Sequence, residues 1–202
     1  MSETSDAGLF PAEHRGLREL HATTKRLHRH WERLADRLGG SAAVALRDGS
    51  EAAAALLAEL ADRGAIHDVH GFPAAQSVGR NLSTARNTGD LFLERNQALR
   101  FAVVDVQHVE LLLEWLQALA ERRGDKEWAG FHRWWAHRLG GVHAAIREVV
   151  LDDAADPDRA IEPADPSAAG RAGTKIATAI GTAGEATDAS PIGRLARRLT
   201  GR

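Results

Sequence analysis

Hydrophobic positions recur at helical spacing over most of the first 150 residues, and the longest uninterrupted pattern runs from Asp90 to Arg123. Within it, one seam in alternating steps of three and four residues is apolar throughout: Leu99, Ala102, Val106, Val109, Leu113, Leu116 and Ala120. A neighbouring seam is apolar except for two members: Ala98, Phe101, Asp105, His108, Leu112, Trp115 and Leu119. Two adjacent seams predict a helix that contacts at least two partner helices. Asp90 is the expected N-cap, and Gly124 is the expected C′ residue.

A second strong pattern predicts a helix that opens at Phe10-Pro11 and ends at Gly39-Gly40, because proline suits the first helical turn. Its seam keeps a heptad rhythm: Leu17, Leu20, Thr24, Leu27, Trp31, Leu34 and Leu38. Residues 41–47 form either a short helix or an extension of the first one. A turn at Asp48-Gly49-Ser50 is expected before the next helix, 51–63, which Gly64 should end.

Two further helices are predicted, at about 73–87 and at about 125–150. The seam of the last helix is Trp128, Phe131, Trp135, Leu139, Val142, Ile146 and Val149. Gly140-Gly141 in its middle indicates a kink or a close helix approach. Because no alternating strand pattern is present, the predicted fold class is all-α: a bundle of four to five helices over residues 9–150, followed by a disordered tail.

The composition changes abruptly after Leu151. Aspartates and prolines dominate first, and an Ala/Gly/Thr-rich run then extends to about Ala189. Almost no large apolar residue is left to bury, so residues 151–190 are predicted to be a flexible acidic and then Ala/Gly-rich linker. Residues 191–202 are predicted to be a C-terminal docking peptide.

Composition and charge exclude several classes of protein. The formal net charge of −2 argues against a globally basic nucleic-acid binder. The absence of cysteine excludes disulfides, thiol catalysis and thiolate metal sites. No apolar run approaches the length of a transmembrane segment, and residues 1–8 lack the apolar region of a signal peptide. We therefore expect a cytoplasmic protein with no nucleic-acid partner and no transmembrane segment.

Asp105 and His108 are the two polar residues on the otherwise apolar second seam, three positions apart, so their side chains can meet. One interpretation is a polar core pair in which His108 satisfies Asp105, because a lone buried carboxylate is costly. The other interpretation is an Asp-x-x-His half-site for a metal, akin to the Glu-x-x-His motif of carboxylate-bridged di-iron bundles. The sequence contains no Glu-x-x-His motif to complete such a site.

The segment Glu13-His14-Arg15-Gly16-Leu17-Arg18-Glu19-Leu20 resembles the opening of the first helix of hemerythrin-like bundles. That resemblance covers residues 13–150 and implies a set of iron ligands spread over several helices. The residues of this chain that match are His14, His67, His108 with Asp105, and His132 or His137. The chain departs from the family's His-x-x-x-Glu pattern, since Gly71 and Gly141 stand four residues after two of these histidines.

The C-terminal sequence Ile192-Gly193-Arg194-Leu195 resembles the Ile-Gly-x-Leu core of the peptides that load cargo into encapsulin nanocompartments. The resemblance implies partner-binding roles for Ile192, Gly193, Leu195 and Leu199. Arg194 departs from it, because that family usually has serine there. The alternative is a basic amphipathic tail that binds an anionic surface such as a membrane or a nucleic acid.

The function expected from these observations is that of a helical-bundle protein recruited through its C-terminal peptide into a protein assembly, an encapsulin shell first among them. The bundle itself would be a divergent metal-handling domain. The alternative is a non-enzymatic adaptor whose bundle binds a partner through Trp128, Trp134 or its histidines. The sequence leaves open whether the protein is an enzyme and whether it forms a homo-oligomer.

Overall fold

The computed structural model describes residues 8–66 and 92–189, and the regular elements within these ranges are helices. They are α1 (Pro11–Leu38), α2 (Gly40–Ile66), α4 (Arg95–Arg123), α5 (Lys126–Asp152), the 3-10 helix η2 (Asp153–Ala155), α6 (Pro157–Ala160) and α7 (Ala168–Ala189). The predicted all-α fold class is confirmed. The predicted helix 73–87 and the predicted docking peptide 191–202 lie outside the described residues.

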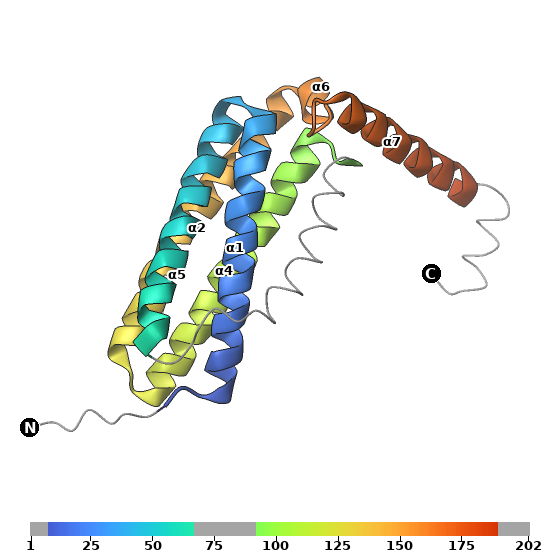
Figure 1. Ribbon diagram of the computed structural model, residues 1–202. Helices are drawn as coiled ribbons and strands as arrows, with labels where there is room; N and C mark the ends of the chain where they lie inside the picture. Colours follow the sequence, from blue (N-terminus) through green and yellow to red (C-terminus); the bar gives the residue numbers. More distant parts are fainter. Residues whose placement is uncertain (1–7, 67–91, 190–202) are drawn as a thin grey trace, which may run out of the picture.

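The four long helices form an antiparallel bundle (Figure 1). α1 packs against α2 and α4, and α5 packs against the same two helices from the opposite corner. In the orientation of Figure 1, α1 and α5 run upward while α2 and α4 run downward. Within residues 8–66 and 92–189, no helix is both long enough and apolar enough to cross a membrane.

Helix α1 follows the predicted heptad seam closely. Leu17, Leu20, Leu27, Trp31 and Leu34 are all buried in the bundle core. The helix begins as predicted, with Pro11 in its first turn and the backbone N–H of Phe10 donating to Glu13 Oε2 at 2.8 Å. It ends before Gly39, whose φ of 63° suits glycine, so the turn into α2 falls where the sequence indicated.

Helix α2 is continuous from Gly40 to Ile66, so the predicted turn at Asp48-Gly49-Ser50 is wrong, as is the predicted end at Gly64. Gly49 is required for packing instead, because a Cβ atom there would overlap the Trp31 ring and lie 2.7 Å from Val142 Cγ1. Ser50 Oγ donates to the His28 carbonyl at 3.0 Å and lies 2.8 Å from His28 Nδ1. A glycine-serine pair whose sequence predicts a turn is therefore a close contact between α1 and α2 within a continuous helix.

Helix α4 buries the whole of its first predicted seam, whereas the second seam is only partly buried. Its end at Gly124 is confirmed, with a left-handed φ of 84°. Its start is not at Asp90 but at Arg95, because the residues just before it pair with another segment. The Leu93 carbonyl accepts from the Ala164 N–H at 2.9 Å, and the Arg95 N–H donates to the Glu162 carbonyl at 2.7 Å.

Helix α5 begins close to the predicted position, and Asp125 is its N-cap, with Asp125 Oδ1 accepting from the Trp128 N–H at 2.9 Å. Its predicted seam is buried along its full length. Gly140 and Gly141 do not interrupt the helix. Gly140 instead permits a close approach, since a Cβ atom there would lie 3.0 Å from Glu110 Oε1.

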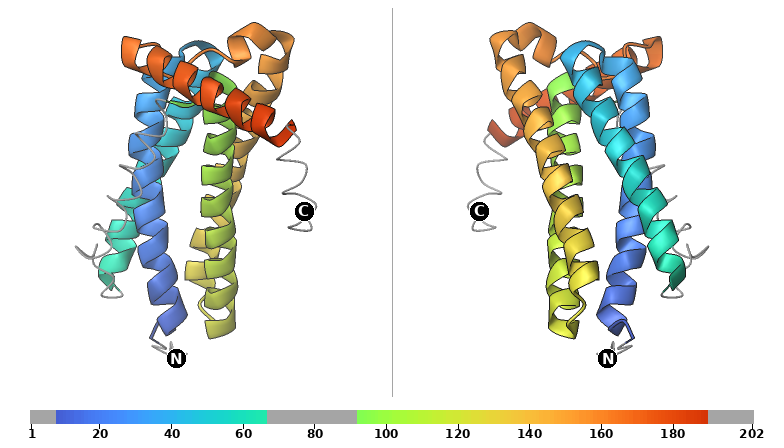
Figure 2. Two further views of the ribbon diagram at one scale, coloured as in Figure 1. Left: turned by 90° about the vertical axis from the view of Figure 1, so that its right-hand side faces the viewer. Right: turned by 90° about the vertical axis from the view of Figure 1, so that its left-hand side faces the viewer.

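The segment after α5 differs from the predicted flexible linker. Much of residues 151–189 is helical, and Ala164 and Asp153 are buried against the bundle. This segment is held against the bundle by a polar contact, because Asp153 pairs with the buried Arg95. The spacing of apolar residues gives no sign of such a contact. Helix α7 then leaves the upper end of the bundle as a projecting arm (Figures 1 and 2).

Candidate functional site

The residues predicted as metal ligands have different environments in the structure. His132 is buried in the core, His14 is half-buried in the first turn of α1, and His108 and His137 are exposed. Within residues 8–66 and 92–189, no group of three or more His, Cys, Asp or Glu side chains is placed to hold a metal ion. His67 lies outside the described residues, so the iron site stays a prediction from the sequence, and we derive no chemistry through it.

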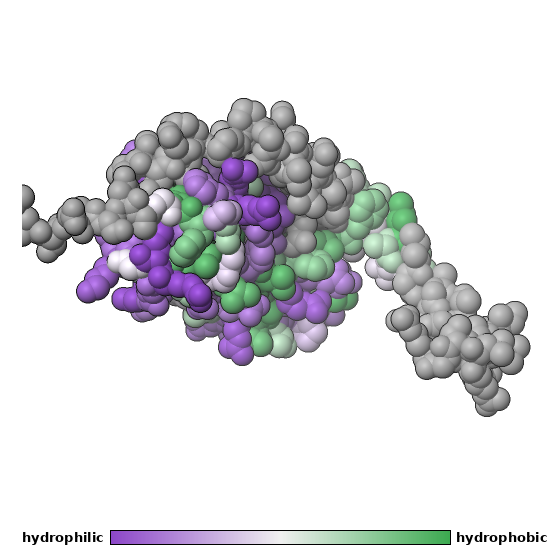
Figure 3. Space-filling view, turned by 90° about the horizontal axis from the view of Figure 1, so that it is seen from below, coloured by the Kyte–Doolittle hydropathy of each residue, from purple (hydrophilic) through white to green (hydrophobic). Residues whose placement is uncertain are grey.

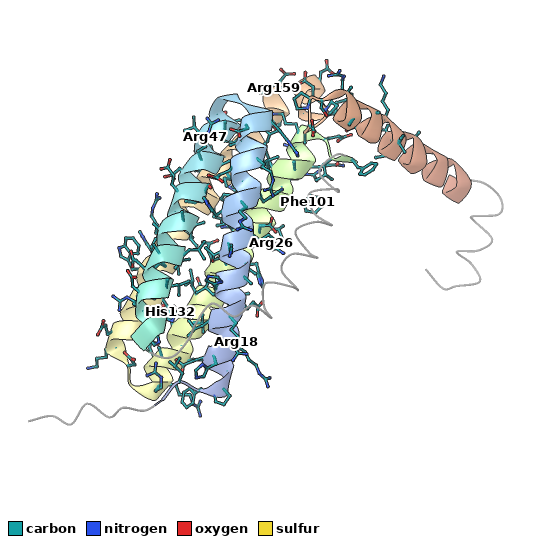
Figure 4. All side chains as sticks on the ribbon, viewed as in Figure 1. Arg18, Arg26, Arg47, Phe101, His132 and Arg159 are labelled. Atoms are coloured by element: carbon teal, nitrogen blue, oxygen red, sulfur yellow. The ribbon has the colours of Figure 1, made fainter. Side chains whose placement is uncertain are left out.

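Asp105 and His108 do not form the predicted polar pair, because each reaches across to α1. Asp105 Oδ1 lies 3.6 Å from Arg26 Nη2, and His108 Nε2 lies 3.1 Å from Glu19 Oε1. Figure 4 shows Arg26 and Phe101 on these neighbouring helices, beside this boundary. The second seam of α4 therefore contributes Ala98 and Leu112 to the core, and it forms a polar edge of the α1–α4 contact at Asp105 and His108.

These contacts determine how much stability each substitution should cost. Because the His108–Glu19 pair is exposed, His108→Ala should change the free energy of unfolding by less than about 1 kcal/mol. Arg26→Ala should cost more, about 1–2 kcal/mol, because the Asp105 carboxylate is only 12% exposed. Urea unfolding of both variants tests this, and a larger loss for His108→Ala would contradict it.

A buried ionic cluster, Glu13, Arg123 and Asp125, closes the lower end of the bundle. Arg123 Nε lies 3.1 Å from Glu13 Oε2, and Arg123 Nη1 lies 3.0 Å from Asp125 Oδ2. The side chains of Glu13 and Arg123 are only 2% and 5% exposed. Each charge also suits its helix: Glu13 and Asp125 lie at helix N-termini and Arg123 at a C-terminus. The cluster ties α1, α4 and α5 together.

His132 lies near this cluster, towards the lower end of the bundle (Figure 4). Its ring contacts those of Trp128 and Phe131, with centroids 5.0 and 5.2 Å away. Its Nδ1 atom is buried without a hydrogen-bond partner. Burial lowers the pKa of His132 from 6.5 to about 3; Asp125 opposes this shift, and Arg123 and Arg63 add to it. His132 is therefore a neutral core residue at neutral pH.

A polar groove of about 470 Å³ lies between α4 and α5. Its lining residues are Glu110, Glu114, Gln117, Arg133, Ala136, His137, Gly140 and Gly141. Burial raises the pKa of Glu110, and this is partly offset by His143, whose Nδ1 lies 2.8 Å from Glu110 Oε2. The lining side chains offer carboxylates, an amide, a guanidinium and an imidazole, so the groove provides hydrogen bonds and charges of both signs.

The upper junction, formed by Arg95, Asp153 and the Leu38 carbonyl, is a second buried polar contact. Arg95 Nε lies 3.3 Å from Asp153 Oδ1, and Arg95 Nη1 donates to the Leu38 carbonyl at 2.8 Å. Asn96 Nδ2 adds a bond of 3.0 Å to the Val150 carbonyl. These bonds join the end of α1, the start of α4 and the end of α5. They fix the point from which the chain continues to α7.

Sequence reasoning missed both buried polar contacts. The sequence does contain a sign of the Glu13–Arg123–Asp125 cluster. Charged residues occupy the terminal turns of three predicted helices, and these turns must meet at one end of a bundle. For the upper junction no comparable signal exists, because Asp153 stands within a run of aspartates that reads as a linker.

Comparison with protein-family models, with curated proteins and with solved structures finds no match for this chain.

Proposed function

We propose that this protein is recruited through its C-terminal peptide into a larger protein assembly, and that an encapsulin shell is that assembly. The supporting observation is the way the chain leaves the bundle. Helix α7 ends at Ala189, directly before the predicted docking residues Ile192, Gly193, Leu195 and Leu199. At 22 residues it is roughly 33 Å long.

The segment that precedes α7, residues 153–167, is attached to the bundle by two ion pairs. The upper junction anchors Asp153, and Arg37 Nη2 lies 3.6 Å from Asp165 Oδ2 just before α7. Helix α7 makes few contacts with the four long helices. The part of it that is visible from below in Figure 3 shows mostly hydrophobic residues. A fixed root with a projecting helix is suited to hold a short peptide away from the bundle surface, where a partner can reach it.

The proposal assigns no metal chemistry to the bundle, because the described histidines do not converge. The competing function is an adaptor with a basic amphipathic tail that binds an anionic surface. One observation favours an adaptor role for the bundle as well: Trp134 is 57% exposed on α5, as an aromatic residue at a protein interface would be.

The test is co-expression with an encapsulin shell protein, followed by purification of the shell. Deletion of residues 191–202 should abolish co-purification while the bundle's thermal unfolding midpoint stays unchanged, since the deleted residues lie beyond α7. The double variant Ile192→Asp, Leu195→Asp should have the same effect with every arginine retained, because it removes the side chains that a groove would bury.

Charge reversal at Arg194, Arg197 and Arg198 is the matched control. Under the shell proposal this triple variant should still co-purify, and binding should persist as salt is raised. If the charge reversal abolishes binding instead, and the protein binds vesicles of anionic lipid in a salt-sensitive way, the adaptor function replaces the shell proposal.

A further inference from the structure

The solvent-facing side of α4 carries an apolar stripe, which we define as Val104, Leu111 and Trp115. Their exposed fractions are 56%, 63% and 43%. Val104 and Leu111 are seven residues apart, so they lie along one line of the helix, about 10 Å from each other, with Trp115 beside them. The line lies opposite the buried seam of the same helix.

This stripe differs from the outer face of α1. On α1, every exposed residue after Pro11 is charged: Arg15, Arg18, Glu19, Arg29, Glu32, Arg33 and Asp36. A helix that is apolar on its outer as well as its inner face is expected to be covered on both. The exposed fractions of Val104 and Leu111 place the stripe on the side of α4 that faces solvent.

The charges beside the stripe indicate what covers it. Arg100, Gln107 and Glu114 are exposed and follow one another at intervals of seven, so they form a parallel line next to the apolar one. Within the part of the chain that the structure describes, neither Arg100 nor Glu114 forms an ion pair. The line therefore has a positive end, a neutral middle and a negative end.

We propose that the stripe is a dimer interface, in which α4 packs antiparallel against α4 of a second copy of this chain. A two-fold axis close to Gln107 places Val104 of each copy against Leu111 of the other. The same axis places Arg100 against Glu114 of the other copy. Trp115, whose ring packs against Gly16 of α1, lies at the edge of this contact. A parallel arrangement would bring like charges together at both ends, so the charge pattern favours the antiparallel one.

The area of the stripe sets the expected strength. The exposed parts of the three side chains sum to roughly 300 Å² per copy, taking 150–250 Å² for a whole large side chain. The largest apolar patch on a typical monomeric protein is about 300–600 Å², and such patches are often functional. The stripe is smaller than the roughly 800 Å² per partner of a standard stable interface. The dimer is therefore expected to be weak, with a dissociation constant in the micromolar range.

Sedimentation equilibrium of the full chain over a range of concentrations tests the proposal. The wild-type protein should show a monomer–dimer equilibrium. Leu111→Glu should weaken the dimer by about tenfold or more, because it places charge at the centre of the apolar contact. The control is Val44→Glu on α2, which changes an apolar residue that is 68% exposed on another helix and should leave the equilibrium unchanged.

A charge exchange tests the antiparallel geometry without touching an apolar residue. Arg100→Glu should weaken the dimer several-fold, and adding Glu114→Arg should restore it, because the exchanged charges again meet across the two-fold axis. A wild-type protein that stays monomeric at its highest soluble concentration would overturn the proposal and would show that the stripe is covered within one chain. A dimer that is insensitive to Leu111→Glu, or one that the second charge change does not restore, would overturn the proposed arrangement.

Discussion

Replacing Arg123 by methionine is expected to lower the free energy of unfolding by about 3–5 kcal/mol. The variant leaves the Glu13 carboxylate, which is 2% exposed, without its cation at 3.1 Å. The carboxylate keeps its hydrogen bond from the Phe10 N–H but loses its counter-ion, and a buried charge without a counter-ion is costly. Asp125, which is 25% exposed and can turn to water, contributes less to this loss. Chemical denaturation at neutral pH measures the difference.

Two further variants make this expectation specific to the buried pair. Glu13→Leu combined with Arg123→Met should recover much of the loss, because replacing a buried ion pair by apolar residues is often nearly neutral. The control is Arg138→Met, which breaks the exposed pair that joins Arg138 to Asp48 at 2.8 Å and should cost less than about 1 kcal/mol. If the double variant is no more stable than Arg123→Met alone, the loss comes from packing at this end of the bundle and not from the unpaired carboxylate.

Acidification is expected to destabilise the bundle through His132. Burial lowers the pKa of this imidazole from 6.5 in the unfolded chain to about 3 in the folded one. Between these values the unfolded chain binds the proton and the folded chain does not, so stability is present above the unfolded pKa and is lost as the pH falls. The contribution of His132 to this loss should be about 2 kcal/mol at about pH 5, and larger at lower pH.

The variant His132→Leu, which has no titratable group at this position, isolates this contribution. Its free energy of unfolding should fall less steeply than that of the wild-type protein between neutral pH and about pH 5. The matched control is His137→Ala, which removes an exposed histidine from the same helix and should keep the wild-type slope. If His132→Leu keeps that slope as well, the acid sensitivity arises from another group.

Apolar periodicity predicted the parts of the fold that apolar packing decides. The seams through Trp31, Leu113 and Trp135 are buried as expected, and the helix ends at Gly39 and Gly124 are confirmed, because glycine at a positive φ is a local signal. These features depend on residues close together in the sequence. They follow from helical geometry whatever the neighbouring helices are.

The errors arose where a distant residue decides the local structure. Gly49 reads as a turn residue, and only the position of the Trp31 ring shows that it makes room within a helix. The sequence predicts that Asp105 pairs with His108, but in the structure Asp105 pairs with Arg26 of α1. The start of α4 is likewise set by backbone pairing with a segment almost seventy residues later. The polar contacts of the candidate site were the hardest to predict, because the two partners of an ion pair have no regular spacing in the sequence.

The two ends of the bundle lie at different distances from the start of α7, the helix that leads toward the C-terminal peptide. Helix α1, at 28 residues, is roughly 42 Å long, and Pro11 lies at the end opposite the root of α7 (Figure 1). In a protein held by its tail, the Glu13 end would therefore be the part of the bundle farthest from the start of α7. A fluorescent or enzymatic fusion placed ahead of Pro11 would be carried at that far end, where it leaves the start of α7 accessible.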